Sequence, residues 1–193
     1  MAIASCSWSW GSTMGKLKLA TFKLSVSLIA IPFLFASLNA ADITLPKNTP
    51  VHVYFSPNGG CTHAIIETIN KSKSEILVQA YIFTSEPIAK ALLGAHKKGV
   101  KVFVILDKSQ KKDGYSPATF FENQGIPTYI DSMHARAHDK VMIVDKETVV
   151  TGSFNFSKSA ETQNSENVLI IQSPELASLY RENWMTHRAH SEY

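Results

Sequence analysis

Residues 138–157, HDKVMIVDKETVVTGSFNFS, hold the densest group of chemically useful side chains in this 193-residue sequence. VMIVD is a short apolar run rich in β-branched residues, which predicts a buried strand. TVVTG predicts a second strand, and KET between them predicts the turn of an antiparallel pair. Side chains two apart on a strand share a face, so His138 should lie beside Lys140, and Ser153 beside Asn155. The rest of the predicted sheet is arranged around this hairpin.

The four side chains of the hairpin have complementary chemistry. Imidazole can act as a nucleophile or as an acid and base. Ammonium, hydroxyl and carboxamide groups are donors suited to phosphate oxygens. We therefore expect a site for a phosphodiester. Gly152 is expected to allow close backbone approach, and Asp145, of opposite parity to Lys140, is expected to organise the turn rather than to act in catalysis.

The spacing H-x-K-x4-D followed by G-S-x-N resembles the H-K-D signature of the phospholipase D superfamily. The whole chain after about residue 50 resembles the short, single-motif bacterial endonucleases of that superfamily. Four further segments carry the resemblance: FSPNGG (55–60), AYIFTS (80–85), KKGVKVFVILDK (97–108) and SAETQNSENVLII (159–171). The resemblance implies a hydrolase that acts on phosphodiester bonds.

The resemblance also implies roles for particular residues. It implies that Glu166, in the N-S-E-N stretch, accepts a hydrogen bond from the second ring nitrogen of His138. Cleavage through a phosphohistidine needs two imidazoles, and this chain has one motif. The family's solution is a homodimer in which His138, Lys140, Ser153 and Asn155 of both chains build one site. Lysines and amides then bind the phosphate oxygens, so we expect no cofactor and no divalent ion.

The beginning of the sequence has the pattern of a secretory signal peptide. Residues 14–41 carry three lysines, then an apolar run at 24–36, then small residues. We assign residues 1–40 to this signal, with Met14 as a second candidate for the start, and residues 41–193 to one domain. A retained membrane anchor is the alternative, but the run is short and contains Pro32. The expected location is therefore periplasmic or secreted, without stable membrane insertion.

Charge does not by itself predict nucleic-acid binding. The sequence has 19 Lys and Arg against 16 Asp and Glu, and the first 40 residues contain three lysines and no acid. The remaining chain thus has 19 − 3 = 16 basic and 16 acidic residues. Binding must come from local clusters. Lys97, Lys98 and Lys101 form one candidate, Lys108, Lys111 and Lys112 another, and Arg136, two residues before His138, is the preferred contact.

Periodicity predicts an α/β domain. Strands are expected at 51–55, 75–83, 100–107, 127–130 and 167–171 besides the hairpin, and helices over THAIIETINKS, from Glu86 to about Gly99, at 116–124 and over PELASLYRENWMTH. Alternating strands and helices followed by a hairpin predict one domain with a mixed, mostly parallel β-sheet flanked by helices on both faces. This architecture is also the one that the resemblance implies.

The cysteines and the other histidines predict no metal site. Cys6 lies in the signal, and Cys61 is expected to be a small buried residue at a helix start. No CxxC or His-rich ligand spacing is present, which argues against a structural zinc. Six histidines are assigned surface or ordinary core roles: His52, His63, His96, His134, His187 and His190.

Three functions remain in competition. The first is an exported, metal-independent, non-specific endonuclease acting on DNA, with RNA as a further candidate. The second is a lipid phosphodiesterase of the phospholipase D type, which shares the chemistry at phosphorus and needs an apolar substrate pocket. The third is a non-catalytic nucleic-acid-binding module, against which His138, Lys140 and Asn155 argue.

Overall fold

The computed structural model describes residues 40–111 and 116–193, so the predicted signal and Lys112 lie outside the described residues, apart from Ala40. The strands are β1 (Val51–Ser56), β2 (Glu75–Ala80), β3 (Lys101–Asp107), β4 (Thr128–Asp131), β5 (Lys140–Val144), β6 (Thr148–Gly152) and β7 (Glu166–Gln172). The helices are α1 (Cys61–Asn70), α2 (Glu86–Lys97), α3 (Pro117–Asn123), α4 (Lys158–Thr162) and α5 (Pro174–His190), with a short 3₁₀ turn, η1 (Lys108–Gln110). All the predicted strands and helices are present.

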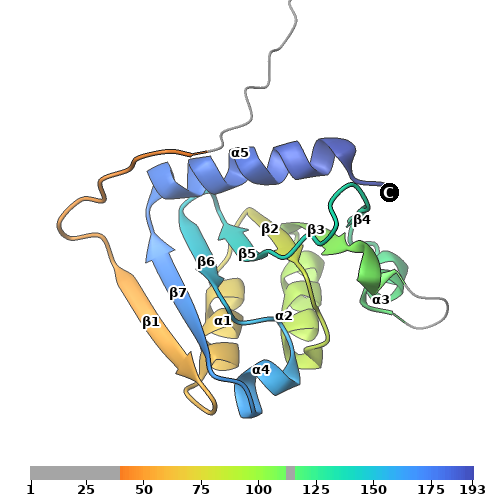
Figure 1. The fold of residues 1–193 in the computed structure, drawn as a ribbon, viewed down its shortest axis with the longest axis horizontal. Coiled ribbons are helices and arrows are strands. Elements are labelled where there is room, and N and C mark those ends of the chain that lie inside the picture. The colour runs from red at the N-terminus through yellow and green to blue at the C-terminus, as the bar shows by residue number, and fades with distance from the viewer. Residues whose placement is uncertain (1–39, 112–115) are drawn as a thin grey trace, which may run out of the picture. The chain divides into compact units, whose positions relative to one another are not determined.

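The seven strands form one sheet in the order β1-β7-β6-β5-β2-β3-β4 (Figure 1). The prediction of a mixed sheet is confirmed, but the prediction that it is mostly parallel is wrong. Only β2–β3 and β3–β4 pair in parallel, and the other four pairings are antiparallel. Parallel neighbours need a crossover, which only α2 and α3 provide here, whereas β5, β6 and β7 follow one another without one.

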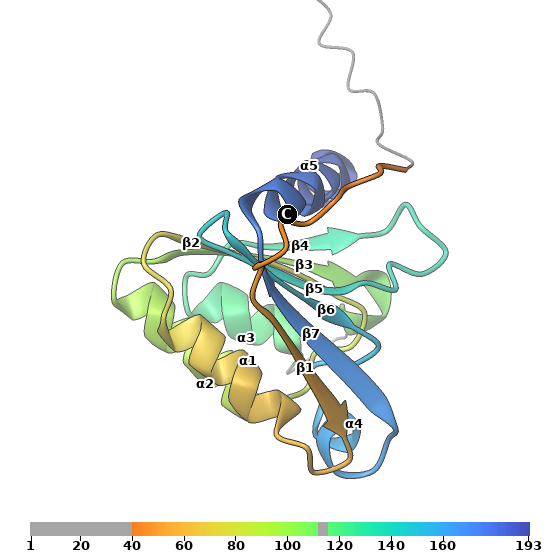
Figure 2. The same ribbon diagram turned by 90° about the vertical axis from the view of Figure 1, so that its left-hand side faces the viewer.

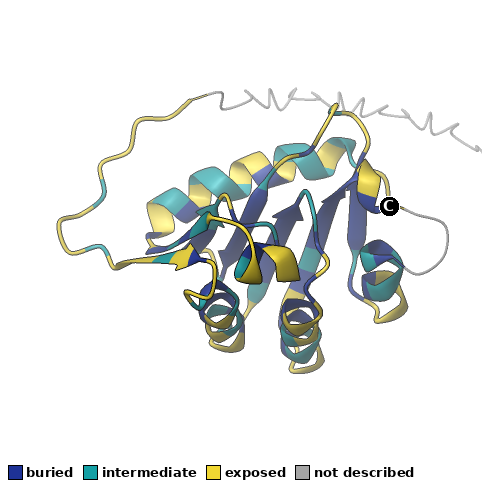
Figure 3. Cartoon of the chain, turned by 60° about the horizontal axis from the view of Figure 1, so that its bottom comes forward, coloured by how far each residue is buried: buried dark blue, intermediate teal, exposed yellow. Residues whose placement is uncertain are grey.

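Helices cover both faces of the sheet, as predicted. Alternate strand residues point to opposite sides, and each side has its own core. The larger core packs β2 residues such as Ile76 and Val78 against α1, α2 and α3. The smaller core packs Trp184 of α5 in one cluster with the strand residues Leu77 and Ile105. Figure 2 shows α5 on one side of the sheet and α1, α2 and α3 on the other, and Figure 3 shows the buried strands between helices whose outer surfaces are exposed.

The closing helix α5 is tied to the sheet by polar contacts as well. The indole nitrogen of Trp184 donates a buried hydrogen bond to the carbonyl of Val78 at 2.9 Å. After the helix, Ile130 and Glu192 exchange two backbone hydrogen bonds of 2.8 and 2.9 Å. The end of the described chain therefore lies against the edge strand β4. The sequence analysis missed α4, which has only five residues and is too short for a periodic pattern.

The topology brings several chain segments to one edge of the sheet. Ala80 at the end of β2 pairs with Lys140 at the start of β5. The end of β6 and the end of β1 lie at the same edge, opposite the start of β7, where Ser56 pairs with Glu166. Loops at this edge therefore collect residues from remote parts of the sequence. Among the residues that the structure describes, no helix is long and apolar enough to cross a membrane.

Candidate active site

His138 and Lys140 lie together at this edge, as their spacing predicts. His138 precedes β5 and is exposed, whereas Lys140, the first residue of β5, is only 7% exposed. The ammonium nitrogen of Lys140 lies 3.1 Å from Nδ1 of His138 and donates to the His138 carbonyl oxygen at 2.7 Å. The ammonium group thus lies against Nδ1 of the imidazole. A neutral imidazole that accepts this contact carries its proton on Nε2, so attack by Nε2 requires the proton to move to Nδ1.

Tyr81 supports this pair from the neighbouring segment. Its ring centroid lies 4.3 Å from that of His138, and the ammonium nitrogen of Lys140 lies 5.2 Å from the Tyr81 ring centroid. The Tyr81 amide donates to the Asp139 carbonyl at 2.8 Å, which fixes the two segments together. The sequence analysis did not assign Tyr81 to the site, although it lies in the AYIFTS segment that carries the resemblance.

The environment of Lys140 changes its ionisation. Burial lowers the pKa of its ammonium group below the ordinary lysine value, and the negative charges of Asp139 and Glu166 oppose that shift without cancelling it. The ammonium charge therefore lies in a weakly hydrated position, where its interaction with a phosphate oxygen is stronger than it would be in open water.

Gly152 ends β6, Ser153 follows it, and both contact β7 closely. Gly152 has φ 151°, and a Cβ at that position would overlap the backbone oxygen of Asn167, so close backbone approach does require glycine there. The Ser153 hydroxyl accepts hydrogen bonds from the Asn167 backbone nitrogen at 3.1 Å and its side-chain nitrogen at 3.4 Å. Because both contacts use the oxygen as acceptor, the hydroxyl hydrogen of Ser153 remains available as a donor.

Asn155 lies between two buried phenylalanines, Phe154 and Phe156. Its side-chain oxygen is buried and has no hydrogen-bond partner among the described residues. Buried polar atoms nearly always have a hydrogen-bond partner. The partner of this oxygen must therefore come from outside the described residues. A hydrogen-bond donor on a substrate or on a second copy of the chain fits that requirement.

The structure does not bring Glu166 to His138 within one chain. The Glu166 carboxylate accepts a hydrogen bond from the Asn164 side chain at 3.1 Å, and its backbone nitrogen donates to the Ser56 hydroxyl at 3.1 Å. Glu166 nevertheless begins β7 at the same edge of the sheet as His138. Its predicted hydrogen bond to the imidazole therefore remains a prediction.

Asp145 organises the hairpin turn, as predicted, and lies far from His138. Asp145 and Lys146 both have positive φ, 54° and 61°, as a tight β-hairpin turn requires. The Asp145 carboxylate accepts hydrogen bonds of 2.7–3.1 Å from Lys73, Ser74 and Glu75, the residues that lead into β2. The five residues of β5 separate it from the edge that carries His138 by roughly 15 Å.

The predicted basic contacts divide between the two edges of the sheet. Arg136 is exposed in the loop before His138, and Lys108 and Lys111 follow β3 at the same edge. Lys97, Lys98 and Lys101 are exposed near the start of β3, at the opposite edge. Among the described residues, the first group lies on the side of the sheet that carries His138.

Three histidines that were assigned ordinary roles converge on one carboxylate. His134, His187 and His190 surround Asp131, which is fully buried. The ordinary assignment missed this cluster because one part lies in the β4–β5 loop and the other in the last turns of α5. Two short spacings were its available signal, since residues three apart on a helix or turn share a face: Asp131 with His134, and His187 with His190.

Comparison with known proteins gives a consistent result. Residues 65–187 match the family model described as "Cardiolipin synthase, PLD-like domain". A phospholipase D of Rickettsia prowazekii is 38% identical over 156 residues, which are 81% of this chain and 76% of that protein. The phospholipase D family member Nuc from Salmonella typhimurium matches with a TM-score of 0.70 and 39% identity, over 75% of this chain and 97% of the other.

A second solved structure shares the fold at lower identity. NucT from Helicobacter pylori matches with a TM-score of 0.69 and 19% identity, over 75% of this chain and 98% of the other. The family match covers most of the chain and includes His138, Lys140, Ser153, Asn155 and Glu166. The chain belongs to the phospholipase D superfamily of hydrolases that act on phosphodiester bonds.

Proposed function

We propose that this protein is an exported endonuclease that hydrolyses DNA, and RNA as a further substrate, through a phosphohistidine intermediate. The observation that carries the proposal is the exposed His138 imidazole held by the buried ammonium group of Lys140, 3.1 Å away. The hydroxyl hydrogen of Ser153 and the side chain of Asn155, whose buried oxygen has no partner among the described residues, extend this site along the same edge of the sheet. Export to the periplasm or medium rests on the signal pattern in residues 14–41.

In the proposed reaction, His138 Nε2 of one chain attacks phosphorus as the bond to the leaving oxygen breaks. A protonated His138 of the second chain gives its proton to that oxygen. Water then attacks phosphorus, the second imidazole takes a proton from the water, and the phosphorus–nitrogen bond breaks. Lys140, Ser153 and Asn155 stabilise the charge that develops on the non-bridging oxygens, so this chemistry needs no divalent ion.

The reaction requires two chains in a two-fold pair. One chain supplies one H-K-D motif, and a two-fold axis brings identical residues together. Because Glu166 contacts Asn164 rather than His138 within one chain, we expect its hydrogen bond to an imidazole to form only in the pair. Such a bond would replace the contact between Lys140 and Nδ1 and would hold the imidazole proton on Nδ1, which leaves Nε2 unprotonated for attack.

Nucleic acid is the preferred substrate for two reasons. The flanking segments resemble those of the single-motif endonucleases, and Arg136, Lys108 and Lys111 are exposed at the catalytic edge. A phosphate backbone that crosses this edge would meet these charges on its way to His138. Such contacts are independent of base sequence, in agreement with a non-specific nuclease.

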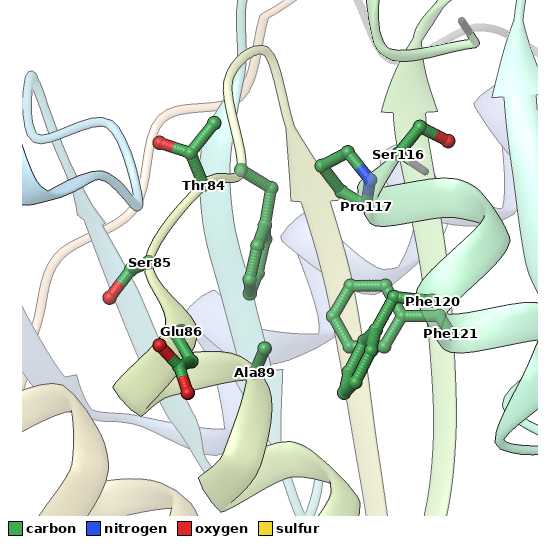
Figure 4. A pocket seen from close by; sticks show the side chains of 9 residues that line it. Thr84, Ser85, Glu86, Ala89, Ser116, Pro117, Phe120 and Phe121 are labelled. Carbon is green, nitrogen blue, oxygen red and sulfur yellow. The ribbon is translucent and has the colours of Figure 1, made fainter. Parts of the chain in front are cut away.

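A lipid phosphodiesterase is the second candidate, and one observation favours it. A pocket of about 340 Å³ opens beside α2 and α3, lined mainly by apolar side chains such as Phe83, Phe120 and Phe121 (Figure 4). Phe83 lies two residues after Tyr81, which contacts His138. An apolar pocket of this size near the catalytic edge fits part of an acyl chain, and the Rickettsia relative is named phospholipase D.

The deciding experiment is plasmid nicking by purified residues 41–193 in excess EDTA, with His138→Asn alongside. We expect nicking by the parent and a loss of at least about 10³-fold in the variant, because the variant lacks the nucleophile. The same two proteins are assayed on phosphatidylcholine vesicles. His63→Asn, an exposed residue of α1, serves as a matched control that keeps the parent activity.

Each outcome separates the candidates. Vesicle hydrolysis without nicking would replace the nuclease with the lipid enzyme. DNA binding without turnover, unchanged in His138→Asn, would support the non-catalytic module. Nicking that survives in His138→Asn would contradict the assignment of the nucleophile.

A further inference from the structure

We propose that Asp131, His134, His187 and His190 form a binding site for one structural transition-metal ion, with zinc as the best match. The four residues come from three places: the end of β4, the following loop and the last turns of α5. One ligand atom from each lies within 4.8 Å of the other three. The site is separate from the catalytic pair and does not depend on the proposed nuclease activity.

The distances bring four potential ligands close to the spacing around a tetrahedral ion. Oδ2 of Asp131 lies 2.9 Å from His134 Nδ1, 2.9 Å from His187 Nδ1 and 3.4 Å from His190 Nε2. Ligands about 2.0–2.1 Å from a tetrahedral zinc ion lie roughly 3.3 Å from one another. Two of the carboxylate-to-imidazole distances are hydrogen-bond distances, and the third, 3.4 Å, matches the ligand spacing around zinc. An ion would therefore replace these hydrogen bonds, with the ligand atoms moving slightly apart.

The carboxylate is oriented by the backbone. Oδ1 of Asp131 accepts hydrogen bonds from the backbone nitrogens of Met133 at 3.2 Å and His134 at 3.3 Å. These contacts fix the carboxylate so that Oδ2 faces all three imidazoles, while Oδ1 also lies 3.1 Å from His134 Nδ1. Outer contacts that fix the orientation of a ligand are characteristic of protein metal sites.

The exposed fractions of the four side chains leave a route by which a metal ion could enter. The Asp131 side chain is 0% exposed, whereas His187, His190 and His134 are 16%, 24% and 43% exposed. An ion can thus enter past the histidines and bind at a buried negative charge. Neutral imidazoles are good zinc ligands, and a carboxylate adds a negative charge to the set.

The ligand set indicates a structural role for the ion. Four protein ligands fill a tetrahedral zinc ion and leave no position for water or substrate. The site lies at β4, three strands from β5, which corresponds to about 14 Å across the sheet. Its effect on the active site would pass through the β4–β5 loop, which His134 would fasten to α5 and which also carries Arg136 and His138.

The test is zinc titration of the full chain, prepared without a histidine tag and stripped with a chelator. We expect one zinc per chain, a rise of several degrees in melting temperature on adding zinc, and a four-coordinate absorption spectrum with cobalt. His187→Asn and His190→Asn should each weaken zinc binding on the order of 100-fold or more. His63→Asn and His138→Asn should bind zinc as the parent does.

The controls keep the outcome decisive. Circular dichroism of the metal-free variants shows whether they are folded, and a folded variant that binds zinc with parental affinity would overturn the proposal. So would zinc binding that is lost in His138→Asn, since the ion would then lie at the catalytic pair. A melting temperature of the parent that neither zinc nor a chelator changes would equally exclude a structural metal.

Discussion

Lys140 is buried, and its ammonium group lies beside the His138 imidazole. The buried charge lowers the stability of the fold, whereas the same charge supports the proposed activity. Its pKa is lowered because burial disfavours the ammonium form, despite the nearby charges of Asp139 and Glu166. A group that is charged more easily in the unfolded chain reduces the stability of the fold at neutral pH. That cost is relieved as the pH rises through the folded pKa towards about 10.4, the unfolded lysine value.

We predict that Lys140→Met retains or raises the melting temperature at pH 7 while activity falls about 100-fold or more. Methionine fills similar space without a charge to bury, and it removes a donor that stabilises the transition state. The advantage in melting temperature over the parent should shrink at pH 10. Lys101→Met, an exposed lysine at the opposite edge, is the control. A Lys140→Met protein that unfolds at ordinary temperature would mean that the lysine is needed for the fold itself.

At the scale of elements, the Asp145 carboxylate links the turn of the β5–β6 hairpin to the segment that enters β2. Asp145 accepts hydrogen bonds from the segment entering β2, so it fixes the antiparallel pairing of β5 with β2. Burial raises the pKa of Asp145, but hydrogen bonds from Ser74, Glu75 and Lys73 lower it by more, and the net pKa lies below the ordinary value. The resulting stabilisation is complete above the unfolded pKa, near 3.9, and is lost as the pH falls through the folded pKa.

We predict that Asp145→Asn lowers the free energy of unfolding at pH 7 by about 1–3 kcal/mol, because charged acceptor bonds are replaced by weaker ones. The difference from the parent should shrink as the pH falls below about 4, where the parent carboxylate is protonated. Urea denaturation at pH 7 and pH 3 measures both values. Glu147→Gln, an exposed residue of the same turn, should change neither. Loss of nicking in the folded Asp145→Asn protein would show that its role extends to the catalytic edge.

Local sequence patterns predicted the positions of strands and helices better than they predicted which strands pair. Alternation and helical spacing located every strand and the four longer helices, because burial of one face is recorded in nearby residues. The pairing of β1 with β7 and the excess of antiparallel neighbours depend on which remote segments meet, which periodicity does not record. The same distinction holds for the site. His138 and Lys140 are two residues apart and were predicted together, whereas Tyr81 and the histidines around Asp131 come from separate segments and were missed.

At the scale of the whole molecule, the proposed site is half complete in one chain. Asn155 has a buried amide oxygen without a partner among the described residues, and Glu166 does not reach His138. Both observations are explained if a second copy of the chain completes the site. Activity should then depend on assembly as well as on the residues of each chain.

We predict that mixing the parent with an equal amount of His138→Asn, followed by re-equilibration, lowers activity per parent chain to about half. Random pairing puts half of the parent chains into mixed pairs, each of which lacks one of the two required imidazoles. Sedimentation of the mixture measures the state of assembly, and plasmid nicking measures activity. Parent activity that is unaffected by the variant, or that persists in a monomeric fraction, would show that one chain carries a complete site.

The two backbone hydrogen bonds between Ile130 and Glu192 have a consequence for solubility. β4 is the last strand of the sheet on its side, and all four of its residues are buried. An uncovered apolar edge strand is a template on which other chains add strands and aggregate. Glu192 occupies the hydrogen-bonding groups of Ile130 and places a charged residue at that edge. The segment after α5 therefore covers this edge of the sheet against self-association. Removal of the residues that follow His190 is expected to make a monodisperse protein aggregate.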